Sequence, residues 1–527
     1  MSKLPFKVFP YSLDQLVALI AEGSHHQSTD EVRTKRHTDY FDHYLKKLKA
    51  KTLLVERNYI DRDFLEDYAA YYVRCFPPYR KTCIRIHVFR ERFTQNAIRA
   101  CLSGDEKSLK LADLKEAYLG FLVIKPLPQT VIGRTCLTTY SDNKTRHFPA
   151  TREFEANLFG VRLGVVKTLP FQEQDSVVAA CATSALWTLF QATAREFQHQ
   201  LLTPIEITRA ATHLLPTESR VIPNHGLSTH MMAHAIKSVN LEPFLIRVAE
   251  GKVLHAAIYS YVHARIPLIL GIDLVEQVAG VRYARMGKHA LAIVGYNLGG
   301  IPTPLSLSGL VLRSSRIDKI YVHDDQIGPF ARMELDGKRV EIEIPGLLPV
   351  RKYDSLSTSW LPDHGTGDVR AVPDILLVPL YHKVRLTWEW ALKRVTEFNE
   401  ALVQFTKIVP ALKLHNLEWD VYLTTVNEVR AELRTAPNIA AAARFSAVTW
   451  PMPRFIWRAT ALRDEVPVID VLYDATDIDT ARGLAQVVFH DSLLRDFIKN
   501  MADANSIDSL PIKNTVKNVL WWVKDNL

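Results

Sequence analysis

The sequence predicts a multidomain α+β protein, and three observations support this fold class. With 527 residues, the chain is long enough for roughly three or four domains that each bury their own core. Hydrophobic residues make up 47% and charged residues 23%, which are ordinary globular values and exclude a wholly disordered chain. Segments with apolar residues at helical spacing alternate with short apolar runs bounded by proline or glycine, which indicates helices mixed with strands.

Residues 1–165 are expected to form an N-terminal α/β domain, whose role the sequence does not reveal. A first helix is predicted near its start, because Leu13, Leu16 and Ile20 share one helical face and Ser12 can cap it. Strands are predicted where compact apolar runs occur, over residues 52–56 and 118–124.

Basic and aromatic residues gather between Tyr79 and Arg92, a composition found in segments that track nucleic acids. The alternation of Ile84, Ile86 and Val88 instead predicts a half-exposed strand. The net charge of +8 is small for a chain of this length and does not demand an anionic partner. We therefore expect no nucleic-acid partner.

The protein is expected to be cytoplasmic and to make no membrane contact. Its most apolar long window, residues 253–275, contains two histidines, an arginine and an aspartate, so it falls short of a membrane span. The five cysteines show no C-x-x-C spacing, which argues against a disulfide framework or a cysteine-rich zinc site. His230 and His234 are four residues apart but lack the glutamate of an H-E-x-x-H motif. We expect no metal and no cofactor, and the oligomeric state is left open.

Residues 379–527 are expected to form a C-terminal α/β domain of unknown role. A polar, turn-rich stretch over 362–368 is predicted to be a loop, and the apolar run at 375–380 is predicted to be a strand. A helix is predicted from about Thr387 to Phe405, because its apolar residues fall on one face. Further strands are predicted over 419–423, 454–457 and 466–472.

The strongest chemical signal lies between these regions, where a cysteine begins a predicted helix. Apolar residues that follow Cys181 fall on one helical face, whereas the residues before it, from Gln172 and Gln174 to the turn formers Asp175 and Ser176, indicate a short extended segment. Cys181 is therefore expected in the first turn of a largely buried helix. Unpaired backbone N–H groups and the positive end of the helix dipole stabilise a thiolate in such a position, which makes it a candidate nucleophile.

A nucleophilic cysteine needs a base, and His289 is the best candidate. It is predicted to start an apolar strand, with Gly287 just before it to give the backbone room. Another predicted strand ends in Asp324 and Asp325 ahead of a Gly-Pro turn, and either acid can orient the imidazole. Strand alternation favours Asp324, because Asp325 is expected to point to the opposite face.

The order Cys181, His289, Asp324 resembles that of papain-like cysteine peptidases, and is closest to their C39-like branch in bacteria. In that branch a glutamine precedes the cysteine, and the histidine begins a segment of the form H-x-x-x-x-x-G-Y, which residues 289–296 match. The resemblance covers about residues 169–335. It implies a papain-like peptidase domain over residues 166–378, in which the helix that bears the cysteine packs on an antiparallel sheet.

The resemblance also implies a role for each residue. Cys181 attacks a carbonyl, His289 takes and returns the proton, and Asp324, or alternatively Asp325, orients the imidazole. Gln174, or alternatively Gln172, helps to stabilise the oxyanion. Gln174 stands a little farther from Cys181 than is usual in the family, which predicts a small additional loop between them.

Three functions are compatible with these residues. The preferred one is a cysteine peptidase that acts on a protein or peptide substrate. The same acyl chemistry would also serve a deamidase or an acyltransferase. A catalytically degenerate interaction protein, with the peptidase fold as a scaffold, is the third possibility.

Overall fold

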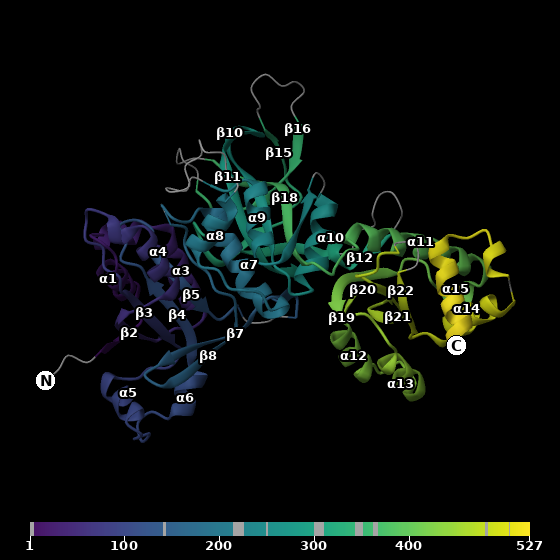
Figure 1. The fold of residues 1–527 in the computed structure, drawn as a ribbon, viewed down its shortest axis with the longest axis horizontal. Helices are drawn as coiled ribbons and strands as arrows, with labels where there is room; N and C mark the ends of the chain where they lie inside the picture. Colours follow the sequence, from purple (N-terminus) through teal and green to yellow (C-terminus); the bar gives the residue numbers. More distant parts are fainter. Residues whose placement is uncertain are drawn as a thin grey trace. The chain divides into compact units, whose positions relative to one another are not determined.

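The computed structural model describes residues 5–140, 144–175, 177–213, 226–248, 251–299, 310–342, 351–361, 367–479, 483–504 and 506–527. The chain is a mixed α+β protein in which most neighbouring strands run antiparallel (Figure 1). It divides into two compact units, each assembled from separate segments. Unit 1 comprises Met1–Ala249, Arg265–Tyr296 and Lys319–Pro379, and unit 2 comprises Glu250–Ala264, Asn297–Asp318 and Leu380–Leu527.

The two units cut the chain differently from the three predicted domains. The first two of these, 1–165 and 166–378, fall largely in unit 1, and the third, 379–527, falls almost wholly in unit 2. The three-domain division stays a prediction. The α/β class expected for the two flanking regions holds only in the coarse sense that both mix helices with strands. Their sheets are antiparallel apart from one short parallel pair, so α+β describes both regions better.

Unit 1 begins with an antiparallel sheet in the order β1-β2-β3-β4-β5. Its strands are β1 (Phe6–Pro10), β2 (Thr52–Tyr59), β3 (Cys83–Phe89), β4 (Tyr118–Ile124) and β5 (Ile132–Leu137). The helices of this region are α1 (Leu13–Gly23), α2 (Thr29–Thr34), α3 (Arg36–Lys47), α4 (Arg62–Ala70), α5 (Gln95–Leu102) and α6 (Leu111–Glu116). The predicted first helix and both predicted strands are confirmed. The Ser12 hydroxyl caps α1 by accepting the backbone N–H of Gln15 at 3.1 Å.

The prediction of a half-exposed strand at residues 84–88 is wrong, because β3 is buried along its whole length. Its position in the middle of the sheet explains the burial, since β2 and β4 pair with it on either side. The guanidinium of Arg85 is bound to Glu56 at 2.5 Å and lies 4.1 Å from the ring centre of Tyr59. This arginine therefore neutralises an internal carboxylate and is not presented to a polyanion.

A second sheet has the main order β14-β13-β11-β10-β18-β17, with β6 and β15 also paired to β11, β9 to β18 and β16 to β15. Its strands are β6 (Arg146–His147), β9 (Leu241–Arg247), β10 (Leu268–Ala279), β11 (Arg282–Leu298), β13 (Ile317–Asp324), β14 (Gly328–Glu334), β15 (Arg339–Ile342), β16 (Arg351–Asp354), β17 (Leu356–Ser357) and β18 (Val369–Tyr381). The helices α7 (Cys181–Phe197), α8 (Pro204–Thr212) and α9 (Thr229–Ser238) belong to the same unit, and α7 contacts β10. The strands β7 (Arg152–Leu158) and β8 (Val161–Thr168) form a separate hairpin.

The strand predicted at residues 375–380 is confirmed as part of β18. Most of the loop predicted at residues 362–368 lies outside the described residues.

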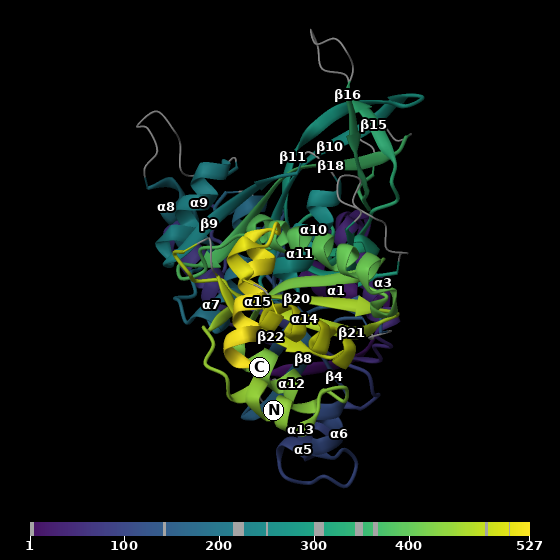
Figure 2. The ribbon, with the colours of Figure 1, turned by 90° about the vertical axis from the view of Figure 1, so that its right-hand side faces the viewer.

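Unit 2 has its own sheet in the order β12-β19-β20-β21-β22. Its strands are β12 (Val311–Leu312), β19 (Glu418–Thr425), β20 (Phe455–Arg463), β21 (Val466–Asp474) and β22 (Leu484–Phe489). Its helices are α10 (Gly251–Val262), α11 (Trp388–Ile408), α12 (Val426–Thr435), α13 (Ala441–Thr449), α14 (Ser492–Ala504) and α15 (Asn514–Asn526) (Figure 2). The predicted helix and strands of this region are all confirmed, with shifts of a few residues at their ends.

Neighbouring residues of β20 and β21 face different helices of unit 2, as strand alternation requires. On one face, Ile456 and Leu472 pack with apolar residues of α12 and α13. On the other face, Tyr473 lies 5.5 Å from the ring of Trp390 in α11. The first face also carries a buried ion pair, in which Asp470 accepts hydrogen bonds from Arg458 at 2.9 Å and from Thr460.

Among the helices that the structure describes, none has both the length and the apolar character needed to cross a bilayer.

Candidate active site

Cys181 is the first residue of α7, as predicted. The helix is buried on nearly all sides after this residue, whereas Cys181 itself is half-exposed. Ala180 stands at the N-cap and has no side-chain acceptor, so its side chain leaves the first backbone N–H groups of α7 uncapped. Cys181 therefore combines solvent access with the positive end of a buried helix dipole.

A turn centred on Asp175 leads the chain into α7. The Asp175 backbone N–H donates to the Ala179 carbonyl at 2.8 Å. Its carboxylate accepts the backbone N–H groups of Val177 and Val178 at 2.8 and 2.9 Å, and the Tyr72 hydroxyl at 2.7 Å. The turn lies between Gln174 and Cys181, and the expectation that this connection is longer than in the papain-like family stays a prediction. Ser176, the other predicted turn former, lies outside the described residues.

His289 lies on β11 opposite Ile272 of β10, and its side chain is buried. The strand begins at Arg282 rather than at the histidine, so the predicted strand start is wrong. Pairing with β10 continues through Gly287, which extends the strand on its N-terminal side. A Cβ at Gly287 would meet no atom within 4 Å, so this glycine is not required for space.

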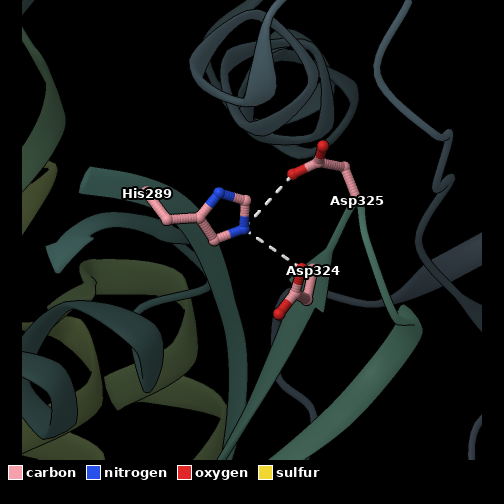
Figure 3. A group of neighbouring side chains, drawn as sticks. All are labelled: His289, Asp324 and Asp325. Carbon is pink, nitrogen blue, oxygen red and sulfur yellow. Dashed lines mark hydrogen bonds and ion pairs between the residues drawn. The ribbon is translucent and has the colours of Figure 1, made fainter. Parts of the chain in front are cut away.

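Cys181 lies beside His289 and, after Asp324 and Asp325, adds to the rise in the pKa of His289. The Nε2 atom of His289 faces two carboxylates, at 3.1 Å from Asp324 Oδ1 and 3.5 Å from Asp325 Oδ1 (Figure 3). Because Nε2 is engaged by these acids, Nδ1 is the ring nitrogen left for the thiol. The structure thus brings together the predicted nucleophile, the predicted base and both candidate acids.

Both acids face the histidine because of where β13 ends. Asp324 is the last residue of β13, and Asp325 begins the turn that leads to β14. The Ile327 N–H donates to the Asp324 carbonyl at 3.0 Å and closes this turn. The expectation that Asp325 points to the opposite strand face is wrong, because alternation no longer applies beyond the strand end. Asp324 has the shorter contact with His289, as the sequence favoured.

Trp360 binds the oxygen of Asp324 that does not face the Nε2 atom of His289. Its indole N–H donates to Asp324 Oδ2 at 2.9 Å, while its ring lies edge-on to His289 at 5.2 Å between centres. The backbone N–H of Gln326 donates to Asp324 Oδ1 at 3.0 Å. Both oxygens of Asp324 are therefore acceptors. Sequence reasoning missed Trp360, whose contact with Asp324 spans 36 positions of the chain.

These contacts fix the charge state of the site. Burial disfavours a charged imidazole, but the carboxylates of Asp324 and Asp325 outweigh it and hold the pKa of His289 well above its usual range. Burial would raise the pKa of Asp324, yet His289 and the N–H donors of Trp360 and Gln326 keep it below its usual value. Burial raises the pKa of Asp325 to about 6, with His289 opposing the rise and Asp324 adding to it. The arrangement favours an imidazolium beside the thiol.

Helix α3, in the N-terminal region, contacts the backbone of Asp325. His37, in the first turn of α3, has its Nε2 atom 2.8 Å from the Asp325 carbonyl, which accepts the hydrogen bond. Its Nδ1 atom lies 3.6 Å from Glu173 Oε1. Glu173, which stands between the two candidate glutamines, also accepts the Ile132 backbone N–H at 2.8 Å. The first predicted domain therefore contributes directly to the surroundings of the site.

The two candidate oxyanion residues are placed differently. Gln172 is buried, whereas Gln174 is half-buried on the extended segment before the Asp175 turn. Within the part of the chain that the structure describes, neither side chain is hydrogen-bonded to Cys181 or His289. The oxyanion role of Gln174, and of Gln172 as its alternative, stays a prediction.

His289, Asp324 and Asp325 offer one nitrogen and two carboxylate oxygens within 4.8 Å of one another. A divalent cation accepts such a donor set. The atoms that face one another here already form an ion pair, and Asp324 also accepts two N–H groups from its neighbours. The carboxylates of the cluster are therefore already paired with His289 and neighbouring N–H groups, and a chelator tests the metal alternative directly.

No protein-family model matches the chain, and no curated protein is significantly similar to it.

Proposed function

We propose that this protein is a cysteine-type hydrolase that cleaves peptide or amide bonds in protein or peptide substrates. The observation that carries the proposal is the placement of Cys181, at the head of α7, beside His289, whose Nε2 atom is held 3.1 Å from Asp324. Covalent acyl transfer needs at least a nucleophile beside a base, and an acid that orients this base. The resemblance to papain-like peptidases agrees with this set.

The proposed mechanism has two halves. The Cys181 thiolate attacks the substrate carbonyl, and the His289 imidazolium gives its proton to the leaving amine, which leaves an acyl-enzyme. Neutral His289 then takes a proton from water, whose hydroxide attacks the thioester and releases the acid. Asp324 keeps the imidazole oriented and stabilises its charged form. The backbone N–H of Cys181, with Gln174 as a second donor, stabilises the oxyanion, and loss of one such donor typically raises the barrier by about 2.7–4 kcal/mol.

The full-length protein is tested on a mixture of proteome-derived peptides, with new termini identified by mass spectrometry. We expect cleavage by the wild type and none by Cys181→Ala or His289→Ala. A Cys101→Ala variant, which removes a thiol from α5, is the matched control. A mass gain of about 1 Da without new termini would identify a deamidase that uses the same acyl chemistry.

Two further results would overturn the proposal. Cleavage that survives Cys181→Ala would exclude this nucleophile. Activity that is lost with a chelator and restored by a divalent metal would assign His289, Asp324 and Asp325 to a metal centre instead.

A further inference from the structure

A cavity of about 540 Å³ opens on unit 1 between residues 70–79 and the turn that precedes Cys181. Four aromatic side chains line it, those of Tyr71, Tyr72, Phe76 and Tyr79. Val177 of the Asp175 turn also contributes to the lining. The volume is in the range of pockets that enclose a small ligand or a large side chain.

The lining of the cavity indicates the chemistry of its occupant. Tyr72 packs edge-on against both Tyr71 and Tyr79, with ring centres 5.4 Å apart in each pair. Phe76 is fully exposed at the same site, so it adds accessible apolar surface to the lining of the cavity. Among the described lining residues, Arg74 is the only charged one, and it is exposed. The cavity therefore suits an apolar or aromatic group that has an acidic group next to it.

The cavity is tied to the proposed nucleophile by the Asp175 turn. The Tyr72 hydroxyl, on its wall, donates to both oxygens of Asp175 at 2.7 and 2.8 Å. Val177 stands four positions before Cys181 (181 − 177 = 4), so their Cα atoms are at most about 14 Å apart at the length of an extended chain. An extended substrate crosses that distance in about four residues.

We propose that this cavity is a specificity subsite for a peptide substrate. It takes a large apolar or aromatic side chain, flanked by an acidic residue that pairs with Arg74, about four residues or fewer from the bond that is cleaved. This inference rests on the proposed function, because it assumes that the same chain reaches Cys181.

Binding is measured with the full-length Cys181→Ala variant, so that turnover does not consume the probe. Cys75 lines the cavity and is half-exposed, and its alkylation rate by iodoacetamide reports occupancy. The probes are short blocked peptides of alanine and serine that carry Asp-Phe-Asp, Lys-Phe-Lys or Asp-Ser-Asp at their centre. We expect the Asp-Phe-Asp peptide to slow alkylation at the lowest concentration, about tenfold below the peptide that lacks the aromatic ring.

Charge reversal at the cavity tests the role of Arg74. Arg74→Glu is expected to weaken binding of the Asp-Phe-Asp peptide about fivefold and to strengthen binding of the Lys-Phe-Lys peptide. The matched control is Arg92→Glu, which makes the same charge change at an exposed arginine that does not line the cavity. It should leave the binding of both peptides unchanged. Equal protection by all three peptides, or the same preference in Arg74→Glu, would overturn the subsite. If phenylacetate protects Cys75 as well as the peptides do, the cavity binds a small aromatic acid, and this result would also overturn the peptide subsite.

Failure of the subsite and failure of the proposed function give different results. Wild-type cleavage of peptides without any protection of Cys75 leaves the hydrolase in place and removes the subsite. Selective protection of Cys75 without any cleavage by the wild type keeps a peptide-binding cavity and removes the hydrolase.

Discussion

Replacement of Asp324 by asparagine tests the geometry of the site most sharply, because both oxygens of this carboxylate accept hydrogen bonds. Oδ1 faces the Nε2 atom of His289 and the backbone N–H of Gln326, and Oδ2 faces the indole N–H of Trp360. An asparagine has one oxygen and one NH₂ group. In either orientation of the amide, the NH₂ group must face an N–H donor.

The Coulomb attraction to His289 is nearly the same for Asp324 and Asp325, so it does not predict which substitution has the larger effect. At 3.1 and 3.5 Å from Nε2, and at an effective dielectric constant of about 20, unit charges attract by about 5.4 and 4.7 kcal/mol. The hydrogen bonds that each acid accepts do predict a difference between the two substitutions. A buried donor left without an acceptor costs about 1–3 kcal/mol, which corresponds to about a 5- to 150-fold change in a rate or an equilibrium. Among the residues that the structure describes, Asp325 Oδ2 accepts a hydrogen bond from the side-chain amide of Gln326 alone, at 3.2 Å, and that amide can turn over.

The assay is the alkylation rate of Cys181 by iodoacetamide at about pH 6.5, where the thiolate depends on the imidazolium. We expect Asp324→Asn to slow this rate about 5- to 150-fold and Asp325→Asn to slow it less. Adding Trp360→Phe to Asp324→Asn removes the donor that the amide opposes, so the double variant should react faster than Asp324→Asn alone. Equal effects of the two asparagine variants, or a double variant slower than both single ones, would refute the hydrogen-bond argument.

Three other predictions concern the pH response and the stability of the fold. Iodoacetate, an anion attracted by the imidazolium, should lose its rate advantage over iodoacetamide as the pH rises through the pKa of His289. Asp325→Asn removes a negative charge that raises this pKa, so the loss should move to lower pH. Gly328 has a φ of +154°, and a Cβ there would lie 2.3 Å from the Tyr40 ring, so Gly328→Ala should lower the denaturant midpoint and slow Cys181 alkylation. Asp470→Ala removes the buried carboxylate that pairs with Arg458, which then keeps only its pair with the exposed Glu432 among the described residues. The change should lower the free energy of unfolding, measured by urea denaturation, by up to about 3–5 kcal/mol.

Local sequence patterns predicted the elements that carry the site. The apolar face after Cys181 predicted α7, and the run at 118–124 predicted β4 with its observed bounds. Such elements are predictable because the period of the apolar residues is set by local geometry. The acids at the end of a strand were likewise recognisable from the turn residues that follow them.

Features that depend on tertiary structure were not predicted. Trp360 reaches Asp324 from a segment 36 positions away, and His37 reaches the Asp325 carbonyl across 288 positions. The burial of β3 depends on its place in the middle of a sheet, and a period of two does not reveal this. The direction of Asp325 depends on where β13 stops, and strand ends are the least predictable feature of a sequence.

The most direct test of the account compares the two half-exposed cysteines within one protein. Cys181 and Cys75 are alkylated by iodoacetamide across about pH 5–9, in the wild type and in His289→Ala, and are read by peptide mapping. The account predicts that Cys181 reacts faster than Cys75 below about pH 7 and loses this advantage in His289→Ala. Reaction of Cys181 no faster than that of Cys75 in the wild type, or an advantage that survives the loss of His289, would contradict it.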